Sequence, residues 1–404
     1  MTEATGSTET AVGRHEKQTD RIELSVIGGP DAGKRISGTR SRCVIGSGDA
    51  VDLALTDPTV SRFHCEIVLE DGRAIVHDLG AKNRTLVEGV AVISAPLADG
   101  AVLTLGNTTV RFEREPEALR TPLSAREQFG GLVGRSRAIR DAFVLLEHAA
   151  ASDTAVLLRG ESGTGKDLAA ASLHQESARR EGPFVVVDVA GVPEAELAEE
   201  LFGTNGAFVR AHGGTLYLVE IGDLELNVQR NLLRAIESSG TDVRLVASTH
   251  RDLRGDVNAR AFRADLYFRL AVLEIVLPPL RERADDIPLI VQSIVSEIEE
   301  PHELVRDPVW IAALLKHPWP GNVRELRSHV ERAARYGRPQ AGSAEQTEQL
   351  MSLKDARARW IKMFESQYLA ELLQAHGGNV TAAARTAGVD RVHFYRLLGR
   401  AGLK

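Results

Sequence analysis

TAVLLRGESGTGKDLAAASLH, residues 154–174, decides the fold of the centre of the chain. It joins an apolar strand-like run to a glycine-rich turn and then to a helix-forming segment. Such a turn lets backbone N–H groups surround phosphate oxygens at a helix N-terminus, while Lys166 reaches the outer phosphates. Asp167 stands where this motif usually carries Ser or Thr. The pattern predicts a phosphate-binding loop; the alternative is a loop of this shape kept only as a folding element.

The flanking sequence divides into segments of different character. Short alternating runs separated by GGPDAG, GSGD, EDGR and ADG predict an all-β sandwich before the loop, and mixed strands and helices predict an α/β domain around it. A polar linker and an all-α segment with an amphipathic helix complete the chain. We therefore expect a multidomain protein with these segments: a disordered leader 1–20, a β-sandwich 21–114, a linker 115–129, an α/β domain 130–338 with a helical lid from about 281, a linker 339–352 and an all-α domain 353–404.

Composition narrows the setting in which the protein works. A chain of 404 residues has room for two to three compact units. Cys43 and Cys65 are the only cysteines, so a disulfide framework is not expected and a reducing compartment is. The sequence has no signal peptide and no run of about 18 apolar residues. We expect a cytoplasmic protein without a membrane partner.

The charge of the chain is unevenly distributed. The net charge is −7, which by itself argues against a nucleic-acid binder. Residues 378–404, however, carry five basic side chains against one acidic side chain. A basic tail on an acidic body is a localised electrostatic footprint for DNA, and the alternative is a solvated helical face.

Eight motifs occur in a fixed order through the α/β domain: GLVGRS, GESGTGKD, ELFGTNGAF, GGTLYLVEIG, VASTHRDL, FRADLYFRL, LPPLRERADDIPL and WPGNVRELR. Together they resemble the central AAA+ domain of sigma-54-dependent transcriptional activators. The resemblance implies that ATP is the ligand, that Glu220 polarises the attacking water, that Arg263 and Arg269 act across a subunit boundary, and that Arg324 senses the nucleotide. It also implies that the phosphates are lined by Gly160, Glu161, Ser162, Gly163, Thr164, Gly165, Lys166 and Asp167.

The departures from that family's pattern share one functional pathway. Val219 replaces the aspartate that precedes the catalytic glutamate, so the carboxylate that holds the Mg²⁺ shell is missing, and His250 replaces an asparagine of the first sensor. Flanking segments are also shorter than in the family, including SSGTD between a helix and a strand. The family's GAFTGA loop, which engages sigma-54, reads GAFVRA at Gly206, Ala207, Phe208, Val209, Arg210 and Ala211. We infer that hydrolysis and sigma-54 remodelling are lost or strongly reduced, and we predict no metal site; the alternative is a working ATPase in which Asp167 or Glu220 replaces the missing ligand.

The sandwich carries a second set of motifs. CVIGSGDAVDLALTDPTVSRFHCEI followed by HDLGAKNRT resembles a forkhead-associated (FHA) domain. By this resemblance Ser61 hydrogen-bonds a phosphothreonine phosphate, His64 braces the loop that holds Ser61, and Asn83 grips the peptide backbone. The remaining candidates are the cations Arg62 and Lys82 and, where the family usually has arginine, Ser47. A doubly charged group needs several converging donors, which these loops can supply.

The C-terminal stretch GGNVTAAARTAGVDRVHFYRLLGRAGL resembles the Fis-type helix-turn-helix of the same activators. We expect a helix near 380–386, a turn at 387–389 and a recognition helix from Asp390. The resemblance places Arg391, Val392, His393 and Arg396 in the major groove and Arg400 on phosphate. The amphipathic helix before it predicts a dimer on palindromic DNA, and the alternative is a protein-binding helical hairpin.

The sequence thus favours an ATP-binding, sequence-specific transcription regulator with a phosphothreonine protein as input. A dimer or an AAA+ ring is the expected homo-oligomer, and RNA polymerase with sigma-54 is a candidate partner. Two alternatives remain: a working sigma-54 activator ATPase, and an FHA adaptor with an AAA+ scaffold.

Overall fold

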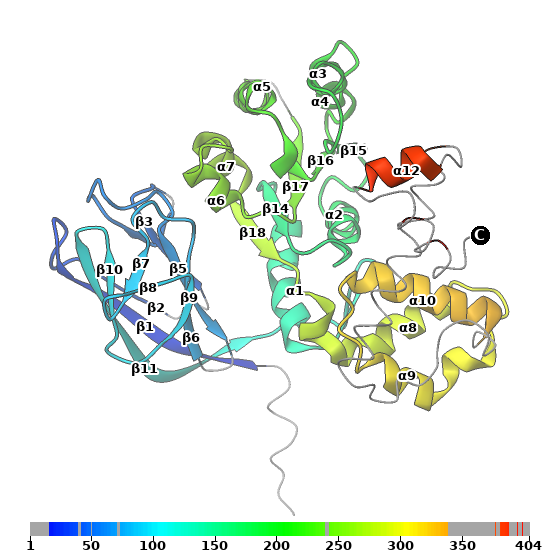
Figure 1. Ribbon diagram of the computed structural model, residues 1–404, viewed down its shortest axis with the longest axis horizontal. Helices are drawn as coiled ribbons and strands as arrows, with labels where there is room; N and C mark the ends of the chain where they lie inside the picture. Colours follow the sequence, from blue (N-terminus) through cyan, green and yellow to red (C-terminus); the bar gives the residue numbers. More distant parts are fainter. Residues whose placement is uncertain are drawn as a thin grey trace, which may run out of the picture. The chain divides into compact units, whose positions relative to one another are not determined.

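The computed structural model describes residues 16–38, 42–49, 51–70, 73–238, 242–337, 376, 380–387, 394 and 398. The chain forms two compact units, residues 1–337 and 338–404. Within the first unit, a β-sandwich precedes an α/β domain that ends in a helical lid (Figure 1).

The N-terminal sandwich consists of two sheets that enclose one apolar core. One sheet has the order β2-β1-β11-β10-β7-β8 and the other β4-β3-β5-β6-β9. In β6 and β10 buried residues alternate with more exposed ones, and Leu24, Ile45, Ile67, Leu103 and Phe112 are completely buried. The predicted all-β fold is confirmed. The strands are β1 (Glu16–Gly28), β2 (Arg35–Gly38), β3 (Arg42–Gly46), β4 (Leu53–Ala54), β5 (Cys65–Glu70), β6 (Arg73–Asp78), β7 (Thr85–Val87), β8 (Val90–Val92), β9 (Ser94–Leu97), β10 (Val102–Leu105) and β11 (Thr108–Pro122).

The first and last strands of the sandwich run further than the sequence indicated. β1 and β11 pair antiparallel from Glu16↔Pro122 onward, inside the segments interpreted as leader 1–20 and linker 115–129. The hydrogen bonds between paired strands join backbone groups only, so a pair of polar strands gives no apolar pattern from which it could be predicted. Later in the same linker, Phe129 is fully buried in the α/β core, where β12 (Gln128–Phe129) pairs with β13 (Leu132–Val133).

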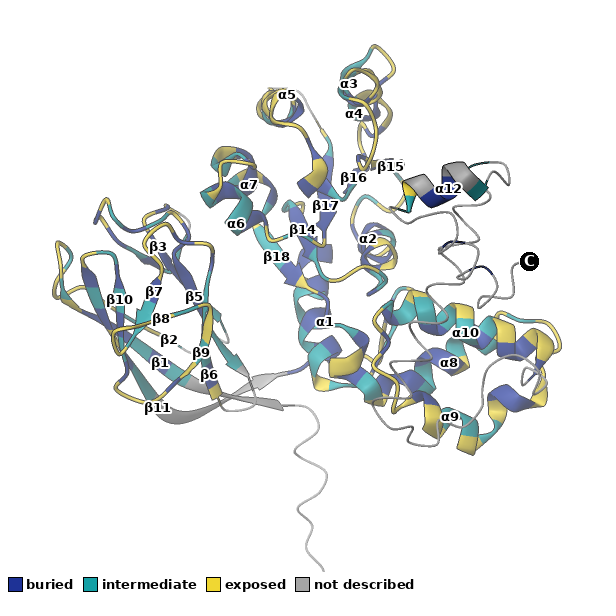
Figure 2. Cartoon of the chain, in the orientation of Figure 1, coloured by how far each residue is buried: buried dark blue, intermediate teal, exposed yellow. Residues whose placement is uncertain are grey.

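The α/β domain is built on a parallel sheet with helices on both faces. The strand order is β15-β16-β17-β14-β18, with β14 at Val156–Arg159, β15 at Phe184–Asp188, β16 at Thr215–Val219, β17 at Arg244–Thr249 and β18 at Leu273–Val276. Strands buried on both faces read as apolar runs, as VLLR and TLYLV do (Figure 2).

Alternate residues of each strand enter different cores. Leu216 and Leu218 pack with one set of helices, whereas Tyr217 between them packs with the other set. Helices α1 (Arg137–Ala150) and α2 (Lys166–Gln175) cover the Tyr217 face. The opposite face is covered by α3 (Glu194–Phe202), α4 (Ala207–Arg210), α5 (Leu226–Glu237), α6 (Leu253–Asn258) and α7 (Ala264–Leu270), and a 3-10 turn, η2 (Ile221–Asp223), follows β16.

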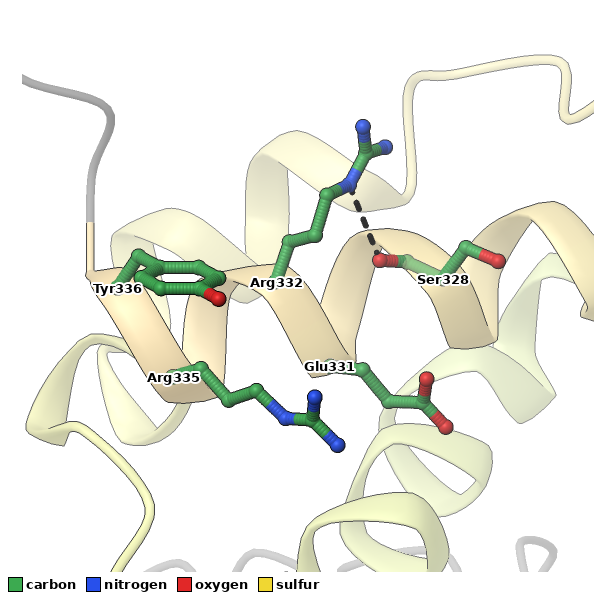
Figure 3. A pocket seen from close by; sticks show the side chains of 5 residues that line it. All are labelled: Ser328, Glu331, Arg332, Arg335 and Tyr336. Atoms are coloured by element: carbon green, nitrogen blue, oxygen red, sulfur yellow. Dashed lines mark hydrogen bonds between the residues drawn. The ribbon is translucent and has the colours of Figure 1, made fainter.

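A separate apolar core forms the lid. It consists of η3 (Leu280–Asp286), α8 (Ile287–Ser296), η4 (Glu303–Arg306), α9 (Pro308–Leu314) and α10 (Asn322–Tyr336). The buried Asp286 carboxylate joins the lid to the start of α1, because it accepts hydrogen bonds from the backbone N–H groups of Arg135 and Ser136 at 2.7 Å. On the outer surface of α10 lies an open hollow lined by Ser328, Glu331, Arg332, Arg335 and Tyr336 (Figure 3).

Only a small part of the second unit is described. α12 spans Val380–Thr386, as the sequence predicted, and Ala383, Ala384, Phe394 and Leu398 form a buried cluster. Thr386 Oγ1 lies 2.9 Å from His376 Nε2. Among the described helices of both units, none has the length and apolar character needed to span a membrane.

Candidate functional site

The glycine-rich loop lies at the carboxyl end of β14 and leads into α2. Gly163 and Gly165 adopt φ values of +80° and +107°, a backbone region that glycine enters at little cost. Gly165 is the N-cap of α2, so the first N–H groups of the helix have no partner in the preceding turn. A helix N-terminus with this geometry attracts phosphate oxygens.

The lid contacts this loop through four side chains, and the buried one, Arg283, donates to the Thr164 carbonyl at 2.7 Å. Arg281 donates two hydrogen bonds to the Glu161 carboxylate at 2.8 and 2.7 Å, and these bonds hold the pKa of Glu161 below its ordinary value. Asn322 donates to both Glu161 Oε2 and the Ser162 carbonyl at 3.1 Å. Arg324 donates to Ser162 Oγ at 2.8 Å. Arg324, which the resemblance predicts to sense the nucleotide, therefore contacts the phosphate-binding loop.

Lys166 is buried beneath the loop. Its Nζ donates to the carbonyls of Gly160 and Glu161 at 3.0 and 3.3 Å, and it lies 3.4 Å from Glu220 Oε1. The ammonium group is thus surrounded by two carbonyl oxygens and one carboxylate oxygen. Arriving phosphate groups would offer stronger acceptors for the same ammonium group.

The carboxylate of Glu220 has a partner on each oxygen. Oε1 faces Lys166, and Oε2 accepts from the backbone N–H of His250 at 3.0 Å and lies 2.7 Å from His250 Nδ1. Burial alone would raise the pKa of Glu220, but the hydrogen bond from His250 and the charge of Lys166 hold it below its ordinary value. Glu220 also has a positive φ of 55°. His250 thus restricts the position of the predicted catalytic carboxylate through both of these contacts.

The position before Glu220 offers no metal ligand. Val219 ends β16 with a half-buried apolar side chain that packs against the α1–α2 core. Asp167, the nearest candidate substitute, accepts a 2.7 Å hydrogen bond from the Tyr217 hydroxyl, and that hydroxyl oxygen accepts from Ser248 Oγ at 2.8 Å. In the described parts of the chain, no group of three or more His, Cys, Asp or Glu residues is placed to hold a metal ion. Val219 therefore cannot supply the carboxylate ligand that Mg²⁺ prefers.

The segment Gly206–Ala211 folds into a short helix instead of a projecting loop. Gly206 is the N-cap of α4, the Phe208 ring stacks on Phe202 of α3 at 5.9 Å, and Arg210 pairs with Glu200. Ala207 and Ala211 are buried, and Val209 alone among these apolar side chains is largely exposed. Only three residues, 212–214, separate this turn from β16.

The two arginines expected to act across a subunit boundary both lie at α7. Arg263 is the N-cap of this helix, and its guanidinium pairs with Asp265 at 3.0 Å. Arg269 lies two turns further on and is exposed. Among the described residues, no printed hydrogen bond or ion pair joins Arg263 or Arg269 to the phosphate-binding loop, and their role across a subunit boundary stays a prediction.

The predicted phosphopeptide residues come together on adjoining loops of the sandwich. Ser61 Oγ accepts from the backbone N–H of Lys82 at 3.0 Å, so its hydroxyl proton remains available. His64 is completely buried, receives the N–H of Ser61 at 3.2 Å and contacts the Arg84 carbonyl at 3.2 Å, as a bracing residue would. Burial lowers the pKa of this imidazole, which keeps it neutral.

The other members of this group face outward. Arg62, Lys82 and Asn83 are exposed, and Asn83 Nδ2 donates to the Thr59 carbonyl at 2.7 Å. Ser47 donates to the Val60 carbonyl at 2.9 Å, so it supports the Ser61 loop from behind. The DNA-binding candidates Arg391, Val392, His393, Arg396 and Arg400 and the amphipathic helix before them lie outside the described residues.

Four side chains of the nucleotide site were not predicted from the sequence: Arg281, Arg283, Asn322 and Tyr217. Arg281 and Arg283 belong to the motif LPPLRERADDIPL and Asn322 belongs to WPGNVRELR, but neither motif indicates which residues of the loop these side chains contact. Tyr217 lies in a run of apolar residues, where its hydroxyl gave no signal. An α/β sheet with a phosphate-binding loop at its edge and a lid in contact with that loop defines the AAA+ class of nucleotide-binding proteins.

Comparisons with known proteins agree with this class. Family models match residues 132–276 (Sigma-54 interaction domain), 281–358 (AAA+ ATPase lid domain), 361–400 (Bacterial regulatory protein, Fis family) and 25–116 (Inner membrane component of T3SS, cytoplasmic domain). The nitrogen assimilation regulatory protein NtrX of Azorhizobium caulinodans is 35% identical over 339 residues, covering 72% of this chain and 74% of that protein.

Two further similarities cover smaller parts. The DNA-binding transcriptional regulator NtrC of Rhizobium meliloti is 39% identical over 244 residues, covering 54% of this chain and 50% of that protein. A solved structure described under phosphothreonine-dependent FHA domain interactions is 29% identical, covering 23% of this chain and 95% of that chain with a TM-score of 0.22. The chain belongs to the family of sigma-54-dependent transcriptional regulators, with an N-terminal β-sandwich, an AAA+ domain and a DNA-binding helix-turn-helix.

Proposed function

We propose that this regulator binds ATP, hydrolyses it weakly or not at all, and controls transcription from sites that its C-terminal domain recognises. The observation that carries the proposal is the pairing of Glu220 with Lys166 and His250 beside the apolar Val219. A phosphate cradle and its lysine are present, which supports binding. Val219 replaces one carboxylate of the hydrolytic site, and the other, Glu220, pairs with Lys166 and His250, which supports reduced ATP turnover.

We expect Val219→Asp to raise Mg²⁺-dependent phosphate release at least tenfold. The substitution supplies the carboxylate that Mg²⁺ prefers as a ligand, at the end of β16 and next to the phosphate cradle. Phosphate release by the full-length protein at high concentration measures the effect. Val186→Asp, on the exposed side of β15, is the matched control and should change little.

The same experiment separates the second candidate function, a working ATPase that uses Asp167 in place of the missing ligand. Asp167 retains one oxygen beyond the hydrogen bond from Tyr217. Rapid hydrolysis by the unaltered protein that Asp167→Ala abolishes and Val219→Asp leaves unchanged would favour this candidate over a binding-only role.

We infer that direct remodelling of sigma-54 polymerase by this protein is also reduced. The segment that would engage sigma-54 is folded into α4, where the stacking of Phe208 on Phe202 and the pairing of Arg210 with Glu200 hold it against α3. Reconstituted open-complex formation with sigma-54 polymerase tests this part. Efficient opening of a promoter by the unaltered chain would contradict it.

The FHA-like sandwich gives the regulator a phosphothreonine input. We expect Ser61→Ala to weaken binding of a phosphothreonine peptide by about tenfold to 150-fold, since a hydrogen bond to a charged group contributes about 1.5–3 kcal/mol. Calorimetry with a peptide selected from a degenerate phosphothreonine library, and with its unphosphorylated twin, measures the loss. Ser37→Ala on β2 is the control, and equal binding of the two peptides by the unaltered protein would refute the input.

A further inference from the structure

The sandwich and the AAA+ domain share a buried interface within residues 16–337. Phe63 of the sandwich is 1% exposed, and its ring packs against Tyr267 and Phe268 of α7 at centroid distances of 5.2 and 5.7 Å. Val44 and Leu79 of the sandwich belong to the same buried cluster as the helices on that face of the AAA+ sheet. The interface therefore contains an apolar core that both domains share.

One side chain of the AAA+ domain joins two loops of the sandwich. Asn258, the last residue of α6, donates from Nδ2 to the carbonyls of Phe63 and Leu79 at 2.5 and 2.9 Å, and its Oδ1 accepts from the Phe63 N–H at 3.4 Å. The amide thereby fixes the distance between these loops. Each carbonyl would otherwise be a partly buried acceptor without this donor.

An ion cluster continues the contact toward the nucleotide site. Glu66 of the sandwich accepts from Arg254 of α6 at 2.9 Å, and Arg254 donates in turn to Glu274 of β18 at 2.6 Å. Glu274 also lies 3.5 Å from Arg42 of the sandwich and 3.0 Å from Arg159. Burial would raise the pKa of Glu274, but these three arginines hold it below its ordinary value.

Arg159 is the residue immediately before the phosphate-binding loop, which begins at Gly160. A continuous set of contacts thus runs from the sandwich through Glu274 to the base of that loop. Buried charged networks of this kind have few alternative arrangements, because an unpaired member costs several kcal/mol. Displacing the sandwich would leave Glu66, Arg254 and Glu274 with fewer partners.

The loops that Asn258 joins also carry the phosphopeptide residues. Ser61 lies two positions before Phe63, and Asn83 lies four positions after Leu79. Phe63 and Leu79 point into the interface, while Arg62, Lys82 and Asn83 are exposed. The AAA+ domain therefore holds both loops from one side and leaves the other side open to a ligand.

We propose that the docked sandwich couples phosphothreonine binding to the nucleotide site, so that each ligand raises the affinity for the other. This inference rests on the proposed phosphothreonine input. Docking orders both loops before the peptide arrives, and the peptide in turn stabilises the docked state that keeps Glu274 paired with Arg159. Coupling of this kind is reciprocal, and typical values correspond to about 5-fold to 150-fold in affinity.

The experiment uses the full-length chain, ADP, and the library-selected phosphothreonine peptide with its unphosphorylated twin. Calorimetry is run for each ligand with and without the other. In the unaltered protein, ADP should raise phosphopeptide affinity at least fivefold, and the phosphopeptide should raise ADP affinity by the same factor. Asn258→Ala should weaken phosphopeptide binding and abolish the coupling, whereas Asn227→Ala, on the exposed surface of α5, should preserve both.

A second variant keeps the test decisive if Asn258→Ala fails to fold. Glu274→Gln keeps the size of the side chain but removes its charge, so it should retain phosphopeptide binding and lose the coupling to ADP. Equal coupling in the unaltered protein and in both variants would overturn the inference alone. Failure of the unaltered protein to distinguish the two peptides would instead overturn the phosphothreonine input, and the coupling with it.

Discussion

The Lys166→Ala variant is expected to bind ATP roughly 100-fold more weakly than the unaltered protein. Lys166 is the buried cation of the phosphate cradle, with Nζ held at 3.0 Å from the Gly160 carbonyl and 3.4 Å from Glu220. Each hydrogen bond to a charged group contributes about 1.5–3 kcal/mol, and about 1.4 kcal/mol corresponds to a tenfold change in affinity. The loss should appear in binding, whether or not the protein hydrolyses ATP.

Calorimetry with ATP and with ADP measures this loss, and Lys316→Ala on the exposed surface of the lid is the matched control.

DNA affinity at matched salt should remain unchanged in Lys166→Ala, because the basic charge and the helix-turn-helix both lie in the C-terminal segment. Arg391→Ala should do the opposite and cost about 1–3 kcal/mol of DNA binding if this side chain reads a guanine. A Lys166 variant that loses its DNA site while the Arg391 variant keeps it would contradict this division.

Much of the architecture follows from local sequence patterns. The run VLLRGESGTGK contains its own strand, turn and helix start, so the phosphate-binding loop could be predicted without knowledge of its surroundings. Short alternating runs of apolar residues likewise predicted the sandwich. These features depend on neighbours a few residues apart, where periodicity carries the information.

The contacts between distant segments could not be predicted in this way. Asn258 meets the Phe63 loop across 195 positions of sequence, and Arg281 meets Glu161 across 120. Nothing in the residues flanking Asn258 distinguishes it from a helix C-terminal asparagine exposed to solvent. Val219, His250 and the segment 206–211 were recognised only as departures, and it took the structure to show that His250 pairs with Glu220 and that the segment forms α4.

Gly163→Ala tests whether closure of the lid onto the loop is required for nucleotide binding. The backbone at Gly163 has a φ of +80°, and a Cβ there would lie 2.4 Å from the Gly321 carbonyl oxygen and 3.0 Å from Arg324 Cβ. The positive φ costs about 1–3 kcal/mol for a residue with a side chain. The short distances to Gly321 and Arg324 would force the loop and α10 apart, so the hydrogen bonds from Arg324 and Asn322 to Ser162 would break. We expect ATP affinity to fall by at least 100-fold.

Gly191→Ala separates the two effects, because Gly191 has a similar φ of +70° but nothing within 4 Å of an added Cβ. It should lower thermal stability through backbone strain while leaving ATP affinity within about twofold. Gly163→Ala should show a comparable loss of stability together with the loss of binding. If both variants bind ATP equally well, the lid contact is dispensable and the backbone N–H groups and Lys166 hold the phosphates without Arg324. If Gly163→Ala fails and Arg324→Ala, which adds no backbone strain to the loop, reproduces part of the defect, the lid is part of the binding site.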